Sequence, residues 1–387
     1  MPRTILHLDL DAFFCAVEEL RDPSLRSKPF AVGGRPDQRG VVASCSYAAR
    51  QFGVRSAMPT ARAFKLCPEL IIISHHHGDY GEMSDKVMER LDNLSPLVEQ
   101  ISIDEAFVDI SDIRDPAEVT ARKIQTQVRT ELGLPCSVGV ASNKLVAKIA
   151  TEVGKHSARG AGPPNAVTIV PAGQEAEFLS PLPVEMLWGV GPKTASSLSD
   201  LGIKTIGDLA AWDEKDLVAR FGENGREMAR HARGISDSPV VTEHEVKSIS
   251  QETTFARDVR DDRVLESTLK ELSAQVGRRL RRSDLTGKTV KLKIRWPDFT
   301  TLTRQATLST PTDQDDEITS TAFRLMKDVR SSGKPVRLIG VGISGLTTEA
   351  RQLELWGMEN EKRRKFQGVI DELQEKFGEK TVHKGQH

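Results

Sequence analysis

The fold is set first by the ten residues ILHLDLDAFF at positions 5–14. Their first part, residues 5–10, is a short apolar run that predicts a buried β-strand. Residues 11–20 then place apolar side chains at helical spacing, so a helix is expected directly after the strand. Asp9 and Asp11 lie where the strand ends. Acids beside a buried strand are costly unless a cation compensates their charge.

A second pair of acids interrupts another apolar stretch. Residues 98–110 alternate as strands do, and Asp104 and Glu105 break the pattern. Such carboxylates suit Mg²⁺, which binds one or two of them together with phosphate oxygens. Asp9 facing this pair from a neighbouring strand would form such a site. Either group alone is more simply interpreted as solvated strand-end acids, but both in one domain favour a metal.

The composition excludes several classes of protein. The chain has 387 residues, enough for about two to four domains. Lys and Arg number 54 against 55 Asp and Glu, which argues against a polycation. No apolar run approaches the ~18 residues of a membrane span, and Asp9 lies where a signal peptide needs its apolar core. The widely spaced cysteines form no Cys-x-x-Cys pair, which favours reduced thiols in a cytoplasmic protein. They are Cys15, Cys45, Cys67 and Cys136.

Periodicity predicts the remaining elements of the first 165 residues as a mixture of strands and helices. The expected strands are residues 41–44, 70–74 and 136–141, and the expected helices are residues 47–52, 83–94, 118–132 and 142–153. Ser142 is the expected N-cap of the last of these helices. Residues 175–235 are expected to be all helical, and residues 236–245 have the composition of a linker.

Residues 246–346 predict a second α/β unit. The expected strands are residues 246–253, 287–296, 299–309 and 336–344, and the expected helices are residues 261–282 and 314–331. The order β-α-β-β-α-β is ferredoxin-like.

Basic residues gather within this second unit. Residues 278–304 contain nine Lys and Arg against two Asp. Lys291, Lys293 and Arg295 share one face of their strand, and apolar residues share the other. Together with Arg278, they predict a cationic surface for a phosphate backbone. A solvated charged face is the alternative.

Six longer motifs resemble those of the Y-family translesion DNA polymerases. They are LDLDAFFCAVE at 8–18, RDP at 21–23, GG at 33–34, SYAARQFGV at 46–54, SIDEAF at 102–107, and SVGVASNK followed by AKIA within 137–150. The motifs keep the family's order and spacing, and the resemblance extends from about residue 4 to 356. It is strongest to the bacterial DNA polymerase IV branch.

The resemblance implies a metal site. Asp9, Asp104 and Glu105 would be the catalytic residues, and they would hold two Mg²⁺ ions together with the carbonyl of Leu10. Asp11 is expected to support the turn or the helix N-terminus rather than to bind metal.

The resemblance also implies a dNTP site. Phe14, with Phe13 beside it, would be the steric gate, because its ring would fill the space that a ribose 2′-hydroxyl needs. Tyr47, Arg50 and Lys155 would contact the triphosphate. Arg binds phosphate through a two-pronged fork, and Lys acts as a point charge.

The segment LWGVGPKTA at residues 187–195 resembles a helix-hairpin-helix motif. Gly189, Gly191 and Lys193 would bind DNA, because such a hairpin presents backbone N–H groups to phosphate without reading sequence. An ordinary glycine-bearing helical turn is the alternative interpretation.

The fold class that the resemblance implies is α+β and multidomain, arranged as a right-hand polymerase. Its parts would be a ferredoxin-like palm (1–12 and 75–165), small fingers (13–74), an all-helical thumb with the helix-hairpin-helix (166–235), a linker (236–245), a β-α-β-β-α-β little finger (246–346) and a C-terminal tail (347–387).

The tail contains QLELW at residues 352–356. It resembles the peptide that bacterial proteins insert into the sliding clamp (its β subunit), with Trp in place of the usual Phe. Gln352, Leu353, Leu355 and Trp356 would contact the clamp. Residues 359–377 beyond it repeat apolar side chains as an amphipathic helix does.

The favoured function is an error-prone, template-directed DNA polymerase in damage tolerance. It would add dNTPs to a primer 3′-hydroxyl on primer-template DNA as a cytoplasmic monomer, without proofreading and without a membrane. Two alternatives remain. A catalytically inert adaptor would not need the intact acids, and a nucleotidyl cyclase would not need the hairpin, the cationic strand or the clamp peptide.

The near-neutral total charge hides a separation along the chain. Residues 1–110 contain twelve Lys and Arg against sixteen Asp and Glu, whereas residues 278–304 are strongly basic. An acidic metal-binding end and a basic DNA-binding end predict few phosphate contacts. The protein should therefore dissociate from DNA easily unless it is tethered.

Overall fold

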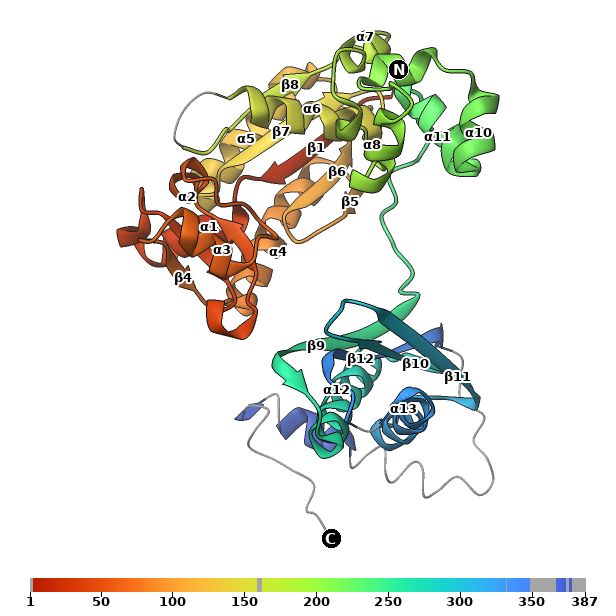
Figure 1. Cartoon of the computed structure of the whole chain (residues 1–387). Coiled ribbons are helices and arrows are strands. Elements are labelled where there is room, and N and C mark those ends of the chain that lie inside the picture. Colours follow the sequence, from red (N-terminus) through yellow and green to blue (C-terminus); the bar gives the residue numbers. More distant parts are fainter. Residues whose placement is uncertain (1–2, 159–161, 332, 349–366, 374–375, 378–387) are drawn as a thin grey trace. The chain divides into compact units, whose positions relative to one another are not determined.

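The computed structural model describes residues 3–158, 162–331, 333–348, 367–373 and 376–377 (Figure 1). The chain divides into two compact units, residues 1–244 and residues 245–387. No described helix combines the length and the apolar character that crossing a bilayer requires.

The first unit is built on a five-stranded sheet in the order β5-β6-β1-β7-β8. The strands are β1 (Ile5–Leu10), β5 (Val98–Gln100), β6 (Glu105–Asp109), β7 (Cys136–Ala141) and β8 (Val167–Ile169). The central strand β1 pairs antiparallel with β6 and β7, and β8 pairs parallel with β7. The predicted strands 5–10 and 136–141 are confirmed, and the stretch 98–110 divides into β5 and β6 at the acids.

Helices cover both faces of this sheet (Figure 1). Leu6, Leu8 and Leu10 pack with α4 (His77–Leu94) and α5 (Ala117–Leu132) in one apolar cluster. Because side chains alternate along a strand, Ile5, His7 and Asp9 belong to the other face. Ile5 packs there with α6 (Lys144–Ser157). The face that α6 covers is therefore the one that carries Asp9.

The N-terminus of α6 differs from the prediction. The N-cap is Asn143, whose Oδ1 accepts a hydrogen bond from the N–H of Val146 at 3.1 Å. Ser142 was expected in this role, but its hydroxyl donates to Glu175 at 2.5 Å. The Ser142 assignment was wrong because both residue types cap helices well and sequence spacing does not separate them.

A second, three-stranded sheet has the order β3-β2-β4. Its strands are β2 (Phe30–Gly33), β3 (Val42–Cys45) and β4 (Ile71–Ile73), and its helices are α1 (Phe13–Arg21), α2 (Tyr47–Gln51) and α3 (Thr60–Leu66). Helix α1 starts two residues later than predicted, because Ala12 before it has a left-handed backbone (φ 49°).

The rest of the first unit is helical, as the composition predicts. It contains α7 (Glu175–Leu179), α8 (Pro192–Ser199), α9 (Ile206–Ala211), α10 (Glu214–Phe221) and α11 (Glu223–Ala232). These helices share an apolar cluster with α6, in which Leu145 and Ile149 of α6 join Leu187 and Leu198 around the Gly-rich turn.

The second unit has the predicted β-α-β-β-α-β order. Its four-stranded sheet runs β11-β10-β12-β9 and is all antiparallel. The elements are β9 (Ser248–Val259), α12 (Asp262–Arg282), β10 (Thr286–Arg295), β11 (Thr301–Thr312), α13 (Asp315–Val329) and β12 (Val336–Thr347). Val290, Leu292 and Ile294 are buried against the helices, which leaves the other face of β10 open.

A short C-terminal segment also packs on this unit. Residues 367–373 are helical, and Ile370 is buried. Asp371 forms an ion pair with Arg281 of α12 at 2.6 Å. The clamp-like peptide 352–356 and much of the predicted helix 359–377 lie outside the described residues.

Candidate active site

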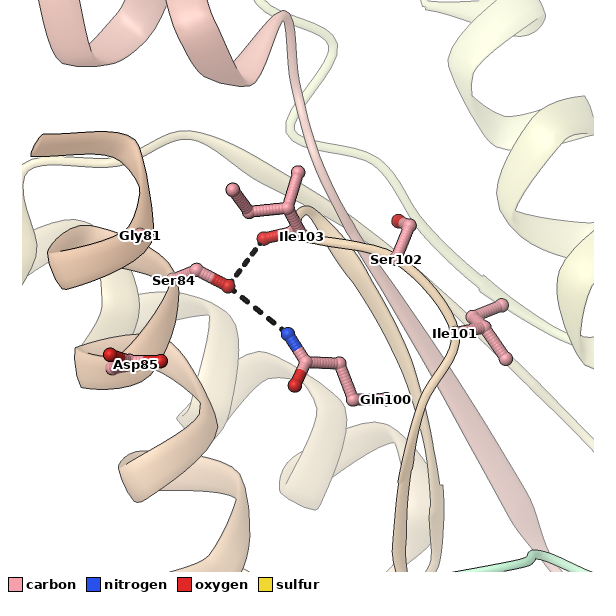
Figure 2. Close-up of a pocket in the computed structure, with 7 residues that line it drawn as sticks. All are labelled: Gly81, Ser84, Asp85, Gln100, Ile101, Ser102 and Ile103. Carbon is pink, nitrogen blue, oxygen red and sulfur yellow. Dashed lines mark hydrogen bonds between the residues drawn. The ribbon is translucent and has the colours of Figure 1, made fainter. Parts of the chain in front are cut away.

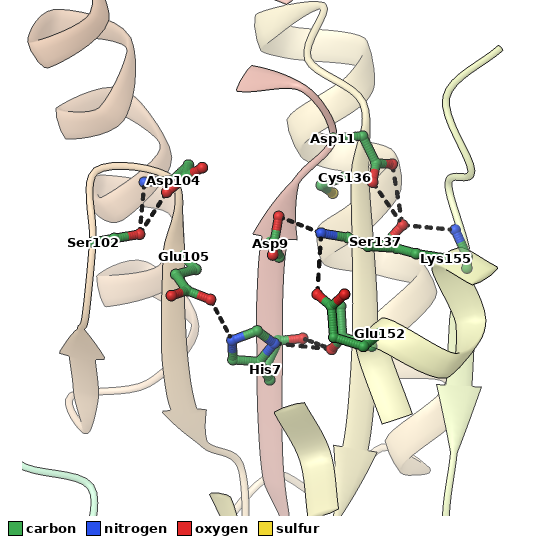
Figure 3. A network of polar contacts seen from close by, with 12 residues as sticks. His7, Asp9, Asp11, Ser102, Asp104, Glu105, Cys136, Ser137, Glu152 and Lys155 are labelled. Carbon is green, nitrogen blue, oxygen red and sulfur yellow. Dashed lines mark hydrogen bonds and ion pairs between the residues drawn. The ribbon is translucent and has the colours of Figure 1, made fainter. Parts of the chain in front are cut away.

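The acids predicted to bind metal meet at one end of the five-stranded sheet (Figure 3). Asp9 on β1 lies directly opposite Glu105 on β6 in the antiparallel register. The N–H of Leu10 donates to the carbonyl of Asp104 at 2.9 Å, so the loop before β6 is fixed beside the end of β1. Strand pairing therefore brings together residues that are about a hundred positions apart in sequence.

Asp9 is held by a lysine. Its Oδ1 lies 2.6 Å from the Nζ of Lys155 on α6. Burial raises the pKa of Asp9 to about 7 despite this partner. Burial by itself would lower the pKa of Lys155, but the nearby acids Asp9, Glu152 and Asp11 together outweigh burial and raise that pKa. The aspartate is a partly buried acid that one ammonium group does not fully compensate.

Glu105 has different partners. Its Oε2 lies 3.2 Å from the Nε2 of His7 and also pairs with the Nζ of Lys148. Burial would raise the pKa of Glu105, but these hydrogen bonds outweigh it and hold the pKa at about 2. The side chain of Asp104 accepts a hydrogen bond from Ser102 at 2.5 Å. The sequence prediction did not assign His7, Lys148 or Ser102 to the site, although Ser102 lies in the SIDEAF motif and Lys148 in AKIA.

The donor set fits a hard divalent cation. Carboxylate oxygens are the ligands that Mg²⁺ prefers, and the raised pKa of Asp9 marks negative charge that still lacks compensation. Within the described residues, no three His, Cys, Asp or Glu side chains converge closely enough to hold an ion as they stand. The reason is that Asp9 turns to Lys155, whereas Glu105 turns to His7 and Lys148.

A cavity of about 210 Å³ opens beside these acids. The residues predicted to bind metal and dNTP all line this cavity except Glu105. Glu105 lies beside the cavity, opposite Asp9 in the pairing of β1 with β6. The predicted residues that line it are Asp9, Leu10, Phe13, Phe14, Tyr47, Arg50, Asp104 and Lys155.

Two contacts order the side chains of Phe14 and Arg50 in this cavity. The ring of Phe14 stacks on Tyr80 with centroids 4.5 Å apart and planes 20° apart. The guanidinium of Arg50 lies 4.6 Å from the ring centroid of Tyr47. Burial raises the pKa of Tyr47, so its hydroxyl remains protonated.

The chain matches known proteins along most of its length. The model of the impB/mucB/samB family matches residues 8–152, its C-terminal domain matches residues 246–355, and the family's helix-hairpin-helix motif matches residues 173–203. The chain is 40% identical to "DNA polymerase IV" of Dehalococcoides mccartyi (strain CBDB1), over 99% of this chain and 97% of that protein. This chain belongs to the Y family of DNA polymerases.

Two further comparisons agree with this family. "DNA polymerase IV" of Desulfatibacillum aliphaticivorans is 42% identical, over 98% of this chain and 95% of that protein. Among solved structures, a Y-family DNA polymerase chimera superimposes with a TM-score of 0.79 at 24% identity. The match covers 89% of this chain and all of the chimera, and it shows the right-hand polymerase fold.

A second, larger opening of about 400 Å³ lies between α4 and the loop from β5 to β6 of the five-stranded sheet (Figure 2). It is lined by Gly81, Ser84, Asp85, Gln100, Ile101, Ser102 and Ile103. The hydroxyl of Ser84 donates to the carbonyl of Ile103 at 2.6 Å, and the amide of Gln100 donates to Ser84 at 3.2 Å. These bonds tie down the loop that presents Asp104.

The structure changes the role of Asp11. This buried carboxylate accepts hydrogen bonds from the hydroxyl of Ser137 at 3.0 Å and the N–H of Asn165 at 3.0 Å. It does not cap α1, whose N-cap Ala12 has no side-chain hydrogen bond. Asp11 instead connects β7 to the chain before β8.

The predicted DNA contacts lie in two places. Gly189 and Gly191 lie at the turn before α8 and the exposed Lys193 lies in the first turn of α8, as expected for a helix-hairpin-helix. Gly189 has φ 99°. The neighbouring ring of Trp188 lies 5.7 Å from the Nζ of Lys148, the partner of Glu105.

In the second unit, the basic residues divide between two layers. Lys291, Lys293 and Arg295 occupy the open face of β10, where Lys293 pairs with Glu252 at 2.7 Å. Arg278 belongs to α12 on the other side of the sheet, and it pairs with Asp371 at 3.8 Å. The structure does not bring Arg278 to the same surface as the other three.

Proposed function

We propose that this Y-family polymerase is a template-directed, error-prone translesion enzyme that adds dNTPs to a primer 3′-hydroxyl in damage tolerance. The single observation that carries the proposal is the cavity at the end of β1. It joins acids suited to metal, such as Asp9, to Arg50 and Lys155, whose cations suit a triphosphate. Nucleotidyl transfer needs both kinds of group at one opening.

Two Mg²⁺ ions would be held by Asp9, Asp104, Glu105 and the carbonyl of Leu10. When bound, such ions supply an activated 3′-hydroxyl and neutralise the charge that develops on the leaving pyrophosphate. The protein contributes the placement of the ligands. The pairing of β1 with β6 sets Asp9 opposite Glu105, and the N–H of Leu10 holds the backbone at Asp104.

The dNTP would lie in the same cavity. Arg50 and Lys155 would bind the triphosphate, and the protonated hydroxyl of Tyr47 would donate to it. The ring of Phe14, stacked on Tyr80, would exclude a ribose 2′-hydroxyl, with Phe13 behind it.

We assign the domains on the same basis. The palm would comprise residues 1–12 and 75–170, the fingers 13–74, the thumb 171–235, the linker 236–245 and the little finger 246–346. The predicted palm boundary at residue 165 is moved because β8 pairs with β7 in the palm sheet. Every described element falls in one of these parts except the short tail helix, so none is left for a 3′→5′ exonuclease.

Primer-template DNA would be held by the hairpin at Gly189–Lys193 and by the open face of β10. The peptide QLELW would bind the sliding clamp and keep this monomeric enzyme on the DNA in the cytoplasm. The cationic row on β10 supports DNA binding there, since phosphate contacts of this kind do not depend on sequence.

The test is primer extension with Mg²⁺ on intact and damaged templates. Wild-type protein should extend past a lesion that stops a replicative polymerase. Asp104→Ala should lose at least about a hundredfold in rate, because the site loses a charged ligand. Asp92→Ala, an exposed aspartate on α4, is the matched control and should extend as wild type does.

Other outcomes point to the alternatives. Full activity of Asp104→Ala would refute the assignment of the site. A wild-type protein that binds DNA but incorporates no nucleotide would be an adaptor, and a cyclic product made from ATP or GTP without DNA would indicate a cyclase.

A further inference from the structure

The two oxygens of Glu105 have different surroundings. Oε2 accepts from the Nε2 of His7 and pairs with Lys148. In the part of the chain that the structure describes, no hydrogen bond reaches Oε1. A carboxylate with one oxygen anchored and the other free can present the free oxygen to a ligand in one fixed orientation.

His7 is placed to do the anchoring. It is fully buried on β1, two residues before Asp9, and its ring lies 4.8 Å from that of Phe107. Its Nδ1 lies 2.9 Å from the hydroxyl of Thr151 on α6. The ring is therefore fixed at both nitrogens and by a packing contact, and Figure 3 shows it pointing to Glu105.

The direction of the hydrogen bond follows from the acceptor. An ionised carboxylate only accepts, so the ring must carry a proton at Nε2. The Thr151 hydroxyl can donate to Nδ1 or accept from it, so it supports this arrangement in either charge state of the ring. The bond between His7 and Glu105 is thus set by the fold and does not depend on the protonation of the histidine.

The second anchor reaches the thumb. Lys148 pairs with Oε2 of Glu105, and its Nζ also lies 5.7 Å from the ring centroid of Trp188. Trp188 packs on Phe107, with ring centroids 5.8 Å apart. The anchored oxygen is thus supported from β1, from α6 and, through Lys148, from the turn that carries Gly189.

We propose that His7 is a positioning residue that, with Lys148, holds Oε2 of Glu105 so that Oε1 faces the divalent ion. The proposal rests on the metal site proposed above. Partners that orient a metal ligand in this way are worth about ten- to a hundredfold in metal affinity or activity. A histidine that merely filled the core would influence folding stability and leave metal affinity unchanged.

The experiment compares His7→Phe and His7→Gln in the full-length protein. Phe keeps a ring and removes the donor, whereas Gln keeps an N–H that can reach Glu105. Mn²⁺ alone is titrated without DNA or nucleotide and followed by electron paramagnetic resonance, so binding is measured apart from activity. His231→Phe on α11 is the matched control, since it makes the same change outside the contacts of Glu105.

His7→Phe should bind Mn²⁺ at least about tenfold more weakly, and kcat should fall by a similar factor while the KM for dNTP stays within about twofold. His7→Gln should recover most of the loss, and His231→Phe should match wild type. Unchanged Mn²⁺ affinity in His7→Phe overturns the proposal, as does an equal loss in the Phe and Gln variants.

Thr151→Val provides a second, milder test if His7→Phe does not fold. It removes the hydroxyl beside Nδ1 at nearly constant volume, and Mn²⁺ affinity should fall by a few-fold. Wild-type affinity in this variant would overturn the proposal. Glu105→Gln separates the two hypotheses: if it binds Mn²⁺ and polymerises as wild type does, the metal site proposed for the function is itself wrong.

Discussion

Phe14 is fixed in the cavity at the end of β1 by its neighbours more than by its own helix. It stacks on Tyr80, whose hydroxyl donates to the buried carboxylate of Glu18 at 2.5 Å. The ring therefore has little freedom to move aside for a larger sugar.

We expect Phe14→Ala to reduce discrimination against ribonucleotides by at least about tenfold, or 1.4 kcal/mol. The smaller side chain opens the space for a 2′-hydroxyl. The measurement is the ratio of kcat/KM for a dNTP to that for the matching rNTP. Phe52→Ala, at the exposed end of α2, is the control. Undiminished discrimination in Phe14→Ala would contradict the gate assignment.

Asp9 gives a pH prediction for the metal-free protein. Its pKa is about 7 when folded, against an ordinary value of 3.8, so the folded state binds more protons than the unfolded state between these values. The cost of an ionised Asp9 to stability therefore grows as pH rises through this range. Replacing Asp9 by Asn removes that cost.

The change in the free energy of unfolding that Asp9→Asn causes should therefore be more stabilising at pH 8 than at pH 5. The difference should be on the order of 2 kcal/mol. Thermal unfolding in EDTA at several pH values measures it. A mutational effect that is the same at both pH values would show that Asp9 does not carry the raised pKa.

Sequence motifs could locate Asp9, Asp104, Phe14, Tyr47 and Arg50, and the structure brings all five to one cavity. They could not locate the partners of Glu105. His7 comes to it through the register of β1 on β6, and Lys148 through the packing of α6 on the sheet. Both contacts join residues from separate elements, which local periodicity does not relate.

Among the elements, the turn before α8 offers a matched pair of glycines. Both have open space where a Cβ would lie, but only Gly189 has a left-handed backbone, with φ 99°, whereas Gly191 has φ −81°. Any L-residue is strained at Gly189, and none is strained at Gly191.

Gly189→Ala should therefore lower stability by about 1 kcal/mol, and Gly191→Ala should not. Both should weaken DNA binding, because Gly191→Ala puts a methyl group where phosphate must approach the backbone. Unfolding and fluorescence-anisotropy measurements separate the two effects. Wild-type DNA affinity in Gly191→Ala would show that this turn does not contact DNA.

The exposed charges on the little-finger sheet lead to a prediction about the salt dependence of DNA affinity. Lys291→Ala on the open face of β10 should reduce the slope of log affinity against log salt concentration by about one. Lys270→Ala, on the exposed side of α12, removes the same charge from the helical layer and should leave the slope unchanged. Equal effects of the two variants would mean that net charge, and not the sheet face, binds DNA.

Helices and long strands were the most predictable elements, since their periodicity is sustained. Three or four residues cannot show a period, so the prediction of short strands was uneven: β3 and β4 were predicted, whereas β2 and β8 were missed. The number of Lys and Arg in residues 278–304 wrongly predicted one cationic surface, because Arg278 lies on a helix across the sheet from Lys291. Strand alternation within β10 identified the exposed face correctly.

For the whole molecule, the two-unit organisation follows from the linker composition, and the second unit begins at residue 245. The family motifs correctly predicted the right-hand polymerase fold. The charge counted from the sequence could not show which positive side chains are available to DNA, because some of them, such as Lys293 with Glu252, form ion pairs within the protein.

Among the described residues, the open face of β10 proposed to bind DNA offers Lys291, Lys293 and Arg295, and Lys293 already pairs with Glu252. We therefore expect the enzyme to add only a few nucleotides per encounter without the clamp. Adding a loaded clamp should lengthen the products about tenfold or more, because tethering raises the local concentration. Leu353→Ala combined with Leu355→Ala should abolish that lengthening. Running-start extension with trap DNA is the measurement. Long products without a clamp would refute the charge argument.

The central place of β1 has a consequence for how this protein is made. Strand β1 is synthesised before both of its neighbours, β6 and β7, so its apolar residues wait for partners that end at Ala141. At ordinary rates of synthesis, that delay is roughly 7 to 25 seconds. Asp9 is therefore synthesised well before the strands and the lysine that surround it in the folded protein. Throughout this interval the unpaired apolar strand β1 is a natural target for chaperones.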